Sequence, residues 1–117
     1  MITCMAEGHD EYFYWDYSER SDILNIHRLG KKTAGSEELG DFTIDFDENN
    51  NIVGVEVVNA SEFFNELNIT KNQLQELTTA EIIVRQKGSY SMILLKLTVA
   101  QIQHTIPLPT PVIMAAT

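Results

Sequence analysis

Apolar and polar side chains alternate strictly in FTIDF, residues 42–46. Successive side chains of a β-strand point to opposite faces, so this alternation predicts a strand with one face buried and one face in water. The turn-forming tract DENNN follows, and the apolar run IVGVEVV at 52–58 resumes an extended pattern. We therefore expect a β-hairpin whose carboxylates Asp45 and Asp47 point into solvent. The side chains expected to face the core are Phe42, Ile44, Phe46, Val53, Val55 and Val57.

Further extended segments lie on both sides of this hairpin. YFYWDY at 12–17 and ILNIHRL at 23–29 predict two strands. AEIIVRQ, YSMILLKLTV and QIQHTI predict a meander after residue 79, and the prolines of IPLPTP limit pairing at its end. The glycine-containing stretch 30–40 predicts a mobile loop, because it has little hydrophobic content. The inner residues expected on the first two strands are Phe13, Trp15, Tyr17, Leu24 and Ile26.

Two short helices are expected between the hairpin and the meander. Asn59 stands at a capping position, and Glu62 follows it at the spacing of a capping box. Thr70 with Gln73 repeats the pattern for a second helix. The sequence thus predicts an α+β fold that is mainly antiparallel β, with about seven short strands and one or two short helices near residues 60–77.

The composition is that of a soluble globular protein. The 117 residues are 44% hydrophobic and 21% charged, and no apolar run approaches the roughly 20 residues needed to cross a bilayer. The segment MITCMAEGHDEY has acidic charges and no long apolar stretch, so a secretory signal is not expected. Cys4 is the single cysteine, which excludes an intrachain disulfide and favours a reducing, cytoplasmic location.

The acidic residues are concentrated in the first half of the chain. Residues 1–66 hold fifteen of the seventeen acids and four of the eight bases. A negative field repels phosphate backbones and attracts basic groups, so no nucleic acid is expected and a basic protein or a cation is the better partner. Net negative charge also serves solubility alone, and this alternative stays open.

ELGDFTIDFDENNNIVGVEVVNASEFF, residues 38–64, resembles the family catalogued as domain of unknown function 2283, whose members carry a pattern like E-x-G-D-x-x-x-D-x-D-x-x-G-x-x-x-G-I-E-x-x-N-A-S. Upstream, Trp15, Asp16 and Asp22 look like the opening of that family, with tryptophan in place of a tyrosine. The resemblance therefore covers about residues 12–67.

The resemblance implies a small, mostly β module with no established activity and no agreed catalytic residues. Asn51 stands where the family often has a hairpin glycine. Residues 68–117 would extend the module at 12–67 by a helix and a β meander, so we expect a single domain, 1–117. Some family members look like neighbours of genes for toxin-like proteins of the ribonuclease type, which makes an antitoxin-like role an implication of the resemblance.

The acidic hairpin contains a pattern like that of a calcium loop. Oxygen-bearing side chains occupy its first, third, fifth, seventh and twelfth positions: Asp45, Asp47, Asn49, Asn51 and Glu56. The sixth position is Asn50 rather than glycine, and both flanks alternate with period two, so the chain is not expected to wrap around an ion. No metal site and no cofactor are expected; a metal-dependent protein or enzyme using Asp45–Glu56 is the alternative.

Other candidate groups have simple structural explanations. The acid pairs Asp45 with Asp47 and Asp16 with Asp22 would need different environments to act as acid and base, and they look equally exposed. The sequence has no nucleophile elbow and no phosphate-binding glycine loop, so no catalytic residue is expected. The three histidines lack the short spacings of zinc motifs. They are His9, His27 and His104.

Three bases gather on the last predicted hairpin, where Arg85, Lys87 and Lys96 lie near Tyr90. They are too few for a nucleic-acid surface, but they can meet an acidic partner or the acidic half of another copy. The sequence therefore favours a non-enzymatic protein-binding or self-associating module. The expected partners are a second copy, with a homodimer favoured, or a basic protein, and no membrane.

Overall fold

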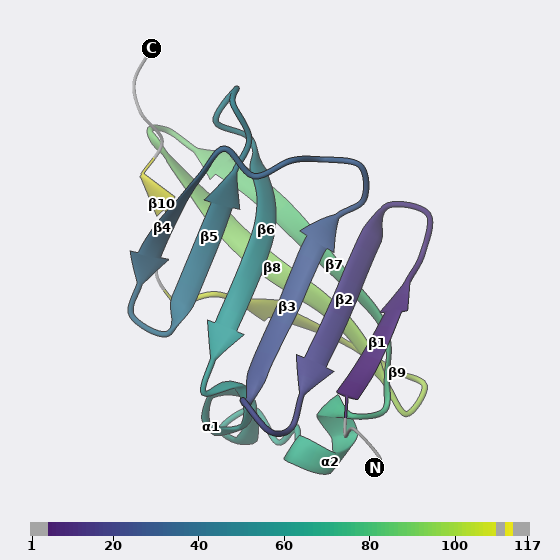
Figure 1. Ribbon diagram of the computed structural model, residues 1–117. Coiled ribbons are helices and arrows are strands. Elements are labelled where there is room, and N and C mark those ends of the chain that lie inside the picture. Colours follow the sequence, from purple (N-terminus) through teal and green to yellow (C-terminus); the bar gives the residue numbers. More distant parts are fainter. Residues whose placement is uncertain (1–4, 110–111, 114–117) are drawn as a thin grey trace.

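The computed structural model describes residues 5–109 and 112–113, which form two antiparallel sheets with two short helices at one end (Figure 1). The first sheet has six strands in the order β1-β2-β3-β6-β5-β4. Their bounds are β1 Met5–His9, β2 Phe13–Ser18, β3 Ile23–Arg28, β4 Gly35–Leu39, β5 Phe42–Phe46 and β6 Ile52–Val58.

The second sheet lies behind the first in Figure 1 and is built around one long hairpin. Strand β8 pairs with β7 along one edge and with β9 and β10 along the other. The bounds are β7 Leu77–Lys87, β8 Tyr90–Val99, β9 Ile102–Pro107 and β10 Val112–Ile113. The helices, α1 Ala60–Asn65 and α2 Lys71–Leu74, connect the two sheets.

One hydrophobic core joins the inner faces of both sheets and the helices. Strand β2 shows the expected alternation, because Phe13, Trp15 and Tyr17 are all buried. Burial of apolar surface on this scale is the dominant favourable contribution to folding. Other fully or nearly fully buried members of the core are Leu24, Ile26, Ile44, Val55, Val57, Phe64, Leu74, Leu95 and Leu97.

The central hairpin is confirmed, because β5 and β6 have the predicted bounds. Phe42 and Ile44 are buried and Phe46 packs against the core from a partly buried position. The pairing of the two strands shifts between Asp45 and Phe46, which is the mark of a β-bulge. The sidedness predicted for Val53 is therefore wrong: the core cluster includes Ile52, and Val53 is buried outside it.

The class is closer to mainly β than to α+β, although both helices exist. More strands are present in the described ranges than the seven or so that the sequence predicts, because β1, β4 and β10 were not expected. Residues 30–40 are not entirely a loop, since β4 pairs with β5. It is an edge strand whose residues are exposed except for the partly exposed Leu39, so no apolar alternation marks it.

The cap of α2 is confirmed and that of α1 is wrong. Thr70 and Gln73 form the reciprocal capping box: Thr70 Oγ1 accepts from the Gln73 N–H at 3.2 Å, and Gln73 Oε1 accepts from the Thr70 N–H at 2.8 Å. Asn59 has a left-handed backbone (φ 54°), and its side chain makes no cap hydrogen bond. Asp22 caps α1 instead, because its carboxylate accepts from the Ser61 N–H at 3.0 Å and from Ser61 Oγ at 2.6 Å.

Two expectations concern residues at the chain ends. Cys4, the proline at 111 and residues 114–117 lie outside the described residues. Pro107 ends β9, as the proline spacing predicts. In the described part of the chain, no helix is long and apolar enough to span a bilayer.

Candidate partner-binding face

The outer face of the six-stranded sheet carries five carboxylates. The strand register places one row of outward residues side by side across all six strands. The row is Glu7, Asp16, Asn25, Glu56, Thr43 and Glu38. Asp45 stands in the next row, two residues along β5. We call the set Glu7, Asp16, Glu38, Asp45 and Glu56 the carboxylate face.

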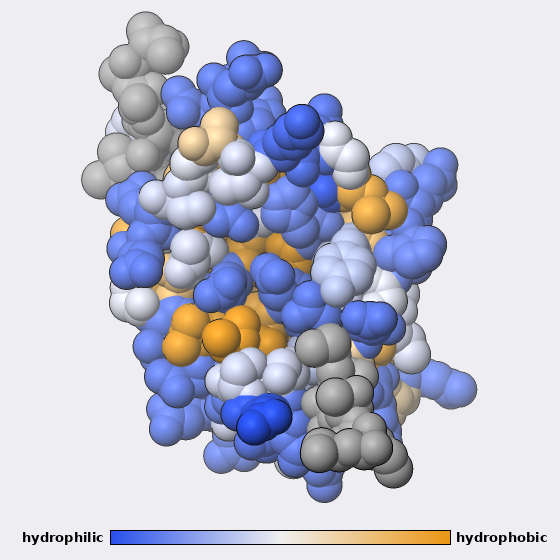
Figure 2. Space-filling view, in the orientation of Figure 1, coloured by the Kyte–Doolittle hydropathy of each residue, from blue (hydrophilic) through white to orange (hydrophobic). Residues whose placement is uncertain are grey.

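No base balances the carboxylate face within the six strands. Arg28 is the only lysine or arginine in their spans. Its guanidinium lies 5.3 Å from the ring centroid of Phe13, whose side chain belongs to the core. Figure 2 shows the outer face as mostly hydrophilic, with apolar surface at only a few places. The charged side chains on the outward side of these six strands are therefore all of one sign.

Tyr14 is a neutral hydrogen-bond donor on this surface. It lies on β2 in the outward row next to Asp16, and its hydroxyl donates to Glu7 Oε2 at 3.5 Å. Burial first, and then the hydrogen bonds and charges of Asp16 and Glu7, raise the pKa of Tyr14 to about 12. Removing a proton beside two carboxylates is unfavourable, so the phenol stays neutral and serves as a donor.

Gly54 has no side chain, which leaves room for Asp45 and His27 to approach each other on the outer face of the sheet. A Cβ at Gly54 would lie 2.6 Å from Asp45 Oδ2 and 2.7 Å from His27 Cδ2. Ser36 Oγ donates to Asp45 Oδ1 at 2.6 Å from the neighbouring strand β4. Nδ1 of His27 donates to the Arg28 carbonyl oxygen at 2.8 Å, and Nε2 lies at hydrogen-bond distance, 3.0 Å, from Thr33 Oγ1. These contacts fix Asp45 and His27 in place.

The calcium-like pattern does not converge on one point. Asp47 closes the hairpin turn: its Oδ1 accepts from the N–H groups of Asn49 and Asn51, both at 2.9 Å. The backbone N–H of Asn51 is the largest of the contributions that lower the pKa of Asp47. Asp45 and Glu56 lie on the carboxylate face instead. In residues 5–109 and 112–113, no group of three or more His, Cys, Asp or Glu side chains is placed to hold a metal ion.

Asp16 and Asp22, which the sequence offers as an acid pair, are separated in the structure. Asp16 belongs to the carboxylate face, whereas Asp22 lies in the turn before β3 and binds Ser61 and Tyr17. Burial would raise the pKa of Asp22, but hydrogen bonds from Ser61 and Tyr17 outweigh it, and the pKa is lowered. Its role in the structure is therefore to join the first sheet to α1.

The bases of the last hairpin lie on the opposite side of the molecule. Arg85, Lys87 and Lys96 share the outward side of β7 and β8, with Tyr90 opposite Lys87. Lys96 Nζ lies 3.7 Å from Glu81 Oε2, so one of the three charges is partly offset. The histidines are divided between the sheets. His9 and His27 lie in one outward row of the first sheet, and His104 lies on β9.

The carboxylate face as a unit could not be found by sequence reasoning. The sequence predicted wet faces for single strands, but the row depends on β3 pairing with β6 and on β4 pairing with β5. The one available signal was the excess of acids before residue 67.

Comparison with known proteins confirms the family resemblance over part of the chain. Residues 15–61 match the family described as Protein of unknown function (DUF2283). An uncharacterized protein of Methanocaldococcus jannaschii is 44% identical over 50 residues, which are 43% of this chain and 43% of that protein. No solved structure matches the chain. The family match runs from within β2 into the first turn of α1, so it includes most of the carboxylate face but neither β1 nor the second sheet.

Proposed function

We propose that this chain, whose residues 15–61 form a DUF2283 module, is a non-enzymatic module that binds a basic protein through its carboxylate face. The observation that carries the proposal is the grouping of five outward carboxylates, four of them in one row, on a six-stranded sheet with no outward lysine or arginine in the six strands.

Electrostatic complementarity supports a basic partner. At physiological ionic strength the Debye length is about 8 Å, so Glu7 and Asp16, on adjacent strands about 5 Å apart, act together. Glu56 and Glu38 follow in the row at every second strand, about 10 Å apart, which is close to one Debye length. Such a surface accelerates encounters with a cationic partner and disfavours acidic ones. A basic ribonuclease-like toxin is one partner with this chemistry, and binding to it would be an antitoxin-like role.

The openness of the face supports binding rather than catalysis. None of the five residues of the carboxylate face lines any of the three main clefts. Small-molecule substrates are generally bound in concave sites that bury most of their surface, whereas protein partners meet broad faces. A row of charges outside these clefts therefore fits a protein surface better than a small-molecule substrate.

Two variants of equal net charge test the proposal. Glu7→Gln/Glu38→Gln/Glu56→Gln removes three charges from the carboxylate face. The control Glu48→Gln/Glu66→Gln/Glu76→Gln removes three exposed carboxylates that lie outside it. The probe is a peptide of alternating lysine and glycine, titrated at low salt by calorimetry. We expect the face variant to bind roughly fivefold more weakly and the control to change little. Equal losses in both variants would show that net charge alone governs binding.

Self-association is a second candidate, and the outer face of β7 and β8 is the surface that favours it. Ile83, Leu94 and Pro107 stand side by side there, and Met92 lies one outward position away from Leu94. Glu81 and Lys96 put both charge signs on this face, as the self-complementary surface of a two-fold dimer requires. Sedimentation should give twice the chain mass for the wild type and a monomer for Leu94→Glu. A monomeric wild type at high concentration would refute the dimer.

A further inference from the structure

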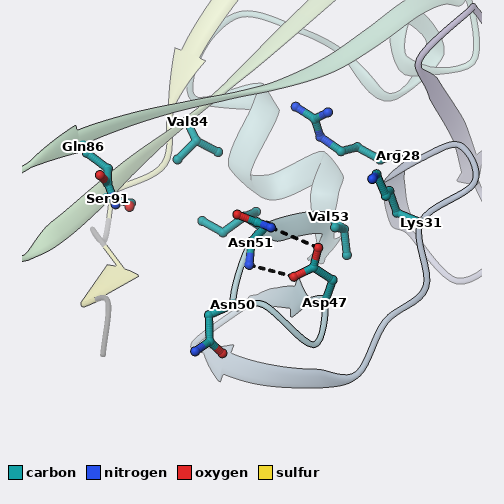
Figure 3. A pocket seen from close by; sticks show the side chains of 10 residues that line it. Arg28, Lys31, Asp47, Asn50, Asn51, Val53, Val84, Gln86 and Ser91 are labelled. Atoms are coloured by element: carbon teal, nitrogen blue, oxygen red, sulfur yellow. Dashed lines mark hydrogen bonds between the residues drawn. The ribbon is translucent and has the colours of Figure 1, made fainter. Parts of the chain in front are cut away.

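A cleft opens between the two sheets beside the hairpin turn of β5 and β6. Its volume is 440 Å³, which lies in the range of small-molecule sites. Figure 3 shows Arg28 and Lys31 on one side, Val84, Gln86 and Ser91 on the other, and Asp47 with Asn51 between them. We call it the hairpin cleft. It shares no residue with the carboxylate face, so a ligand bound in it is independent of the proposed function.

Ser91 supplies a buried polar group without a partner at this cleft. Its side chain is fully buried, and its Oγ makes no hydrogen bond in the described structure. In the described chain, Ser91 Oγ and Trp15 Nε1 are the two buried side-chain polar atoms without a hydrogen bond, and of the two only Ser91 lines this cleft. An unmade hydrogen bond of a buried hydroxyl is destabilising, so such groups call for an explanation. A ligand seated in the cleft would satisfy it.

The cleft has a small excess of positive charge. Arg28 and Lys31 form no salt bridge within residues 5–109 and 112–113. Asp47 also lines the cleft, but its two oxygens already accept hydrogen bonds from the turn. Arg28, Lys31 and Asp47 together give the cleft a net charge of about +1, which suits a ligand with a single negative charge better than a phosphate dianion.

Apolar side chains complete the lining. The β-bulge takes Val53 out of the core and places it on the cleft wall beside Ile52. Val84 faces them from β7 with 39% of its surface exposed. Bulges often occur next to binding sites, because they redirect a side chain. The walls therefore suit a compact apolar body.

We propose that the hairpin cleft binds a small organic monocarboxylate, with its carboxylate toward Arg28 and Lys31, its apolar body against Val53 and Val84, and a polar atom within reach of Ser91. This arrangement uses three features of the cleft: the unpartnered hydroxyl, the two bases that form no salt bridge in the described residues, and the displaced valine.

Amide NMR of the full chain tests binding directly. The probes are benzoate and hexanoate, with benzamide, hexanamide and inorganic phosphate as controls, each at roughly 10 mM, which nearly fills a millimolar site. We expect shifts confined to residues around Arg28, Lys31, 50–53, Val84 and 86–91 with a carboxylate only. Absence of shifts with both carboxylates, or equal shifts with phosphate or the amides, would overturn the proposal.

Charge-matched variants test the assigned roles. Arg28→Gln/Lys31→Gln should weaken carboxylate binding roughly tenfold. Arg20→Gln/Lys32→Gln makes the same charge change at residues that do not line the cleft, and should change binding less than about twofold. Ser91→Ala should weaken binding and leave the Tm of the free protein unchanged or higher, because its hydroxyl has no partner. A fall of several degrees in that Tm would contradict the unpartnered state of Ser91.

Discussion

Asp22 connects two parts of the fold through a single carboxylate. It accepts from Tyr17 OH at 2.7 Å and from both the N–H and Oγ of Ser61. Asp22→Asn keeps a side chain that tolerates the left-handed backbone of this position (φ 57°) but removes the charge. We expect it to lower the free energy of unfolding by about 1–2 kcal/mol, measured by urea denaturation.

Glu62→Gln is the matched control for Asp22→Asn. Glu62 occupies the position at which the sequence predicted a capping box, yet it is exposed and Asn59 makes no side-chain cap. The change should alter stability by less than about 0.5 kcal/mol. A larger loss of stability from Glu62→Gln than from Asp22→Asn would show that Glu62 does form the capping box, contrary to the structure.

The lowered pKa of Asp22 predicts a pH dependence. Burial would raise this pKa, but hydrogen bonds from Ser61 and Tyr17 lower it below the ordinary value of an aspartate, about 3.9. Its stabilising effect is therefore complete above about pH 4 and is lost as the pH falls through the folded-state pKa. Urea denaturation from pH 6 to pH 2 should show a steeper acid loss for the wild type than for Asp22→Asn. Parallel curves would assign the acid sensitivity to other groups.

Gly54 is required by the close approach of Asp45 and His27. Gly54→Ala would place a Cβ within 2.6 Å of Asp45 Oδ2, so we expect a loss of about 1–3 kcal/mol in urea denaturation. Gly35→Ala is the control, because nothing lies within 4 Å of its added Cβ. It should leave stability unchanged or raise it by up to about 1 kcal/mol. Similar losses of stability for both variants would show that replacing a strand glycine is destabilising in general, and not because of the contacts of Asp45 and His27.

At the scale of the elements, α2 depends on its capping box. Thr70→Ala removes the acceptor for the Gln73 N–H, which should cost about 1 kcal/mol of unfolding free energy. Asn72→Ala, at an exposed position of the same helix, should have no effect or a small stabilising one, because alanine is the better helix former. Thermal denaturation of both variants measures this difference in stability. If Thr70→Ala is as stable as the wild type, α2 is stabilised by packing alone and not by its capping box.

Sequence patterns predict correctly those elements whose own residues carry both an apolar face for the core and a turn at the end. β5, β6 and β8 have the predicted bounds, because each buries an apolar set and ends at a turn. β4 is stabilised by pairing with β5 alone, so its polar sequence carries no such signal. The cap of α1 comes from 39 residues away, and no local motif indicates it.

At the scale of the whole molecule, sheet order decides where the charges lie. β3 and β6 pair although 23 residues separate the last residue of one from the first of the other. This pairing places Asp16 and Asn25 in line with Glu56 and Thr43. Sequence reasoning predicted the acidic half but not its arrangement as a face, because strand order between distant segments is set by the common core. The bases Arg85 and Lys87 are on the other sheet.

The location of a bound basic probe is the most direct test of the carboxylate face. Amide NMR of the wild type with the lysine-glycine peptide at low salt should show its largest shifts on β2, β3, β5 and β6, at residues near Asp16, Asn25, Thr43 and Glu56. These shifts should vanish as salt is added, since exposed charges are screened. Shifts concentrated on β7 and β8, or spread evenly over the acidic residues, would contradict the account.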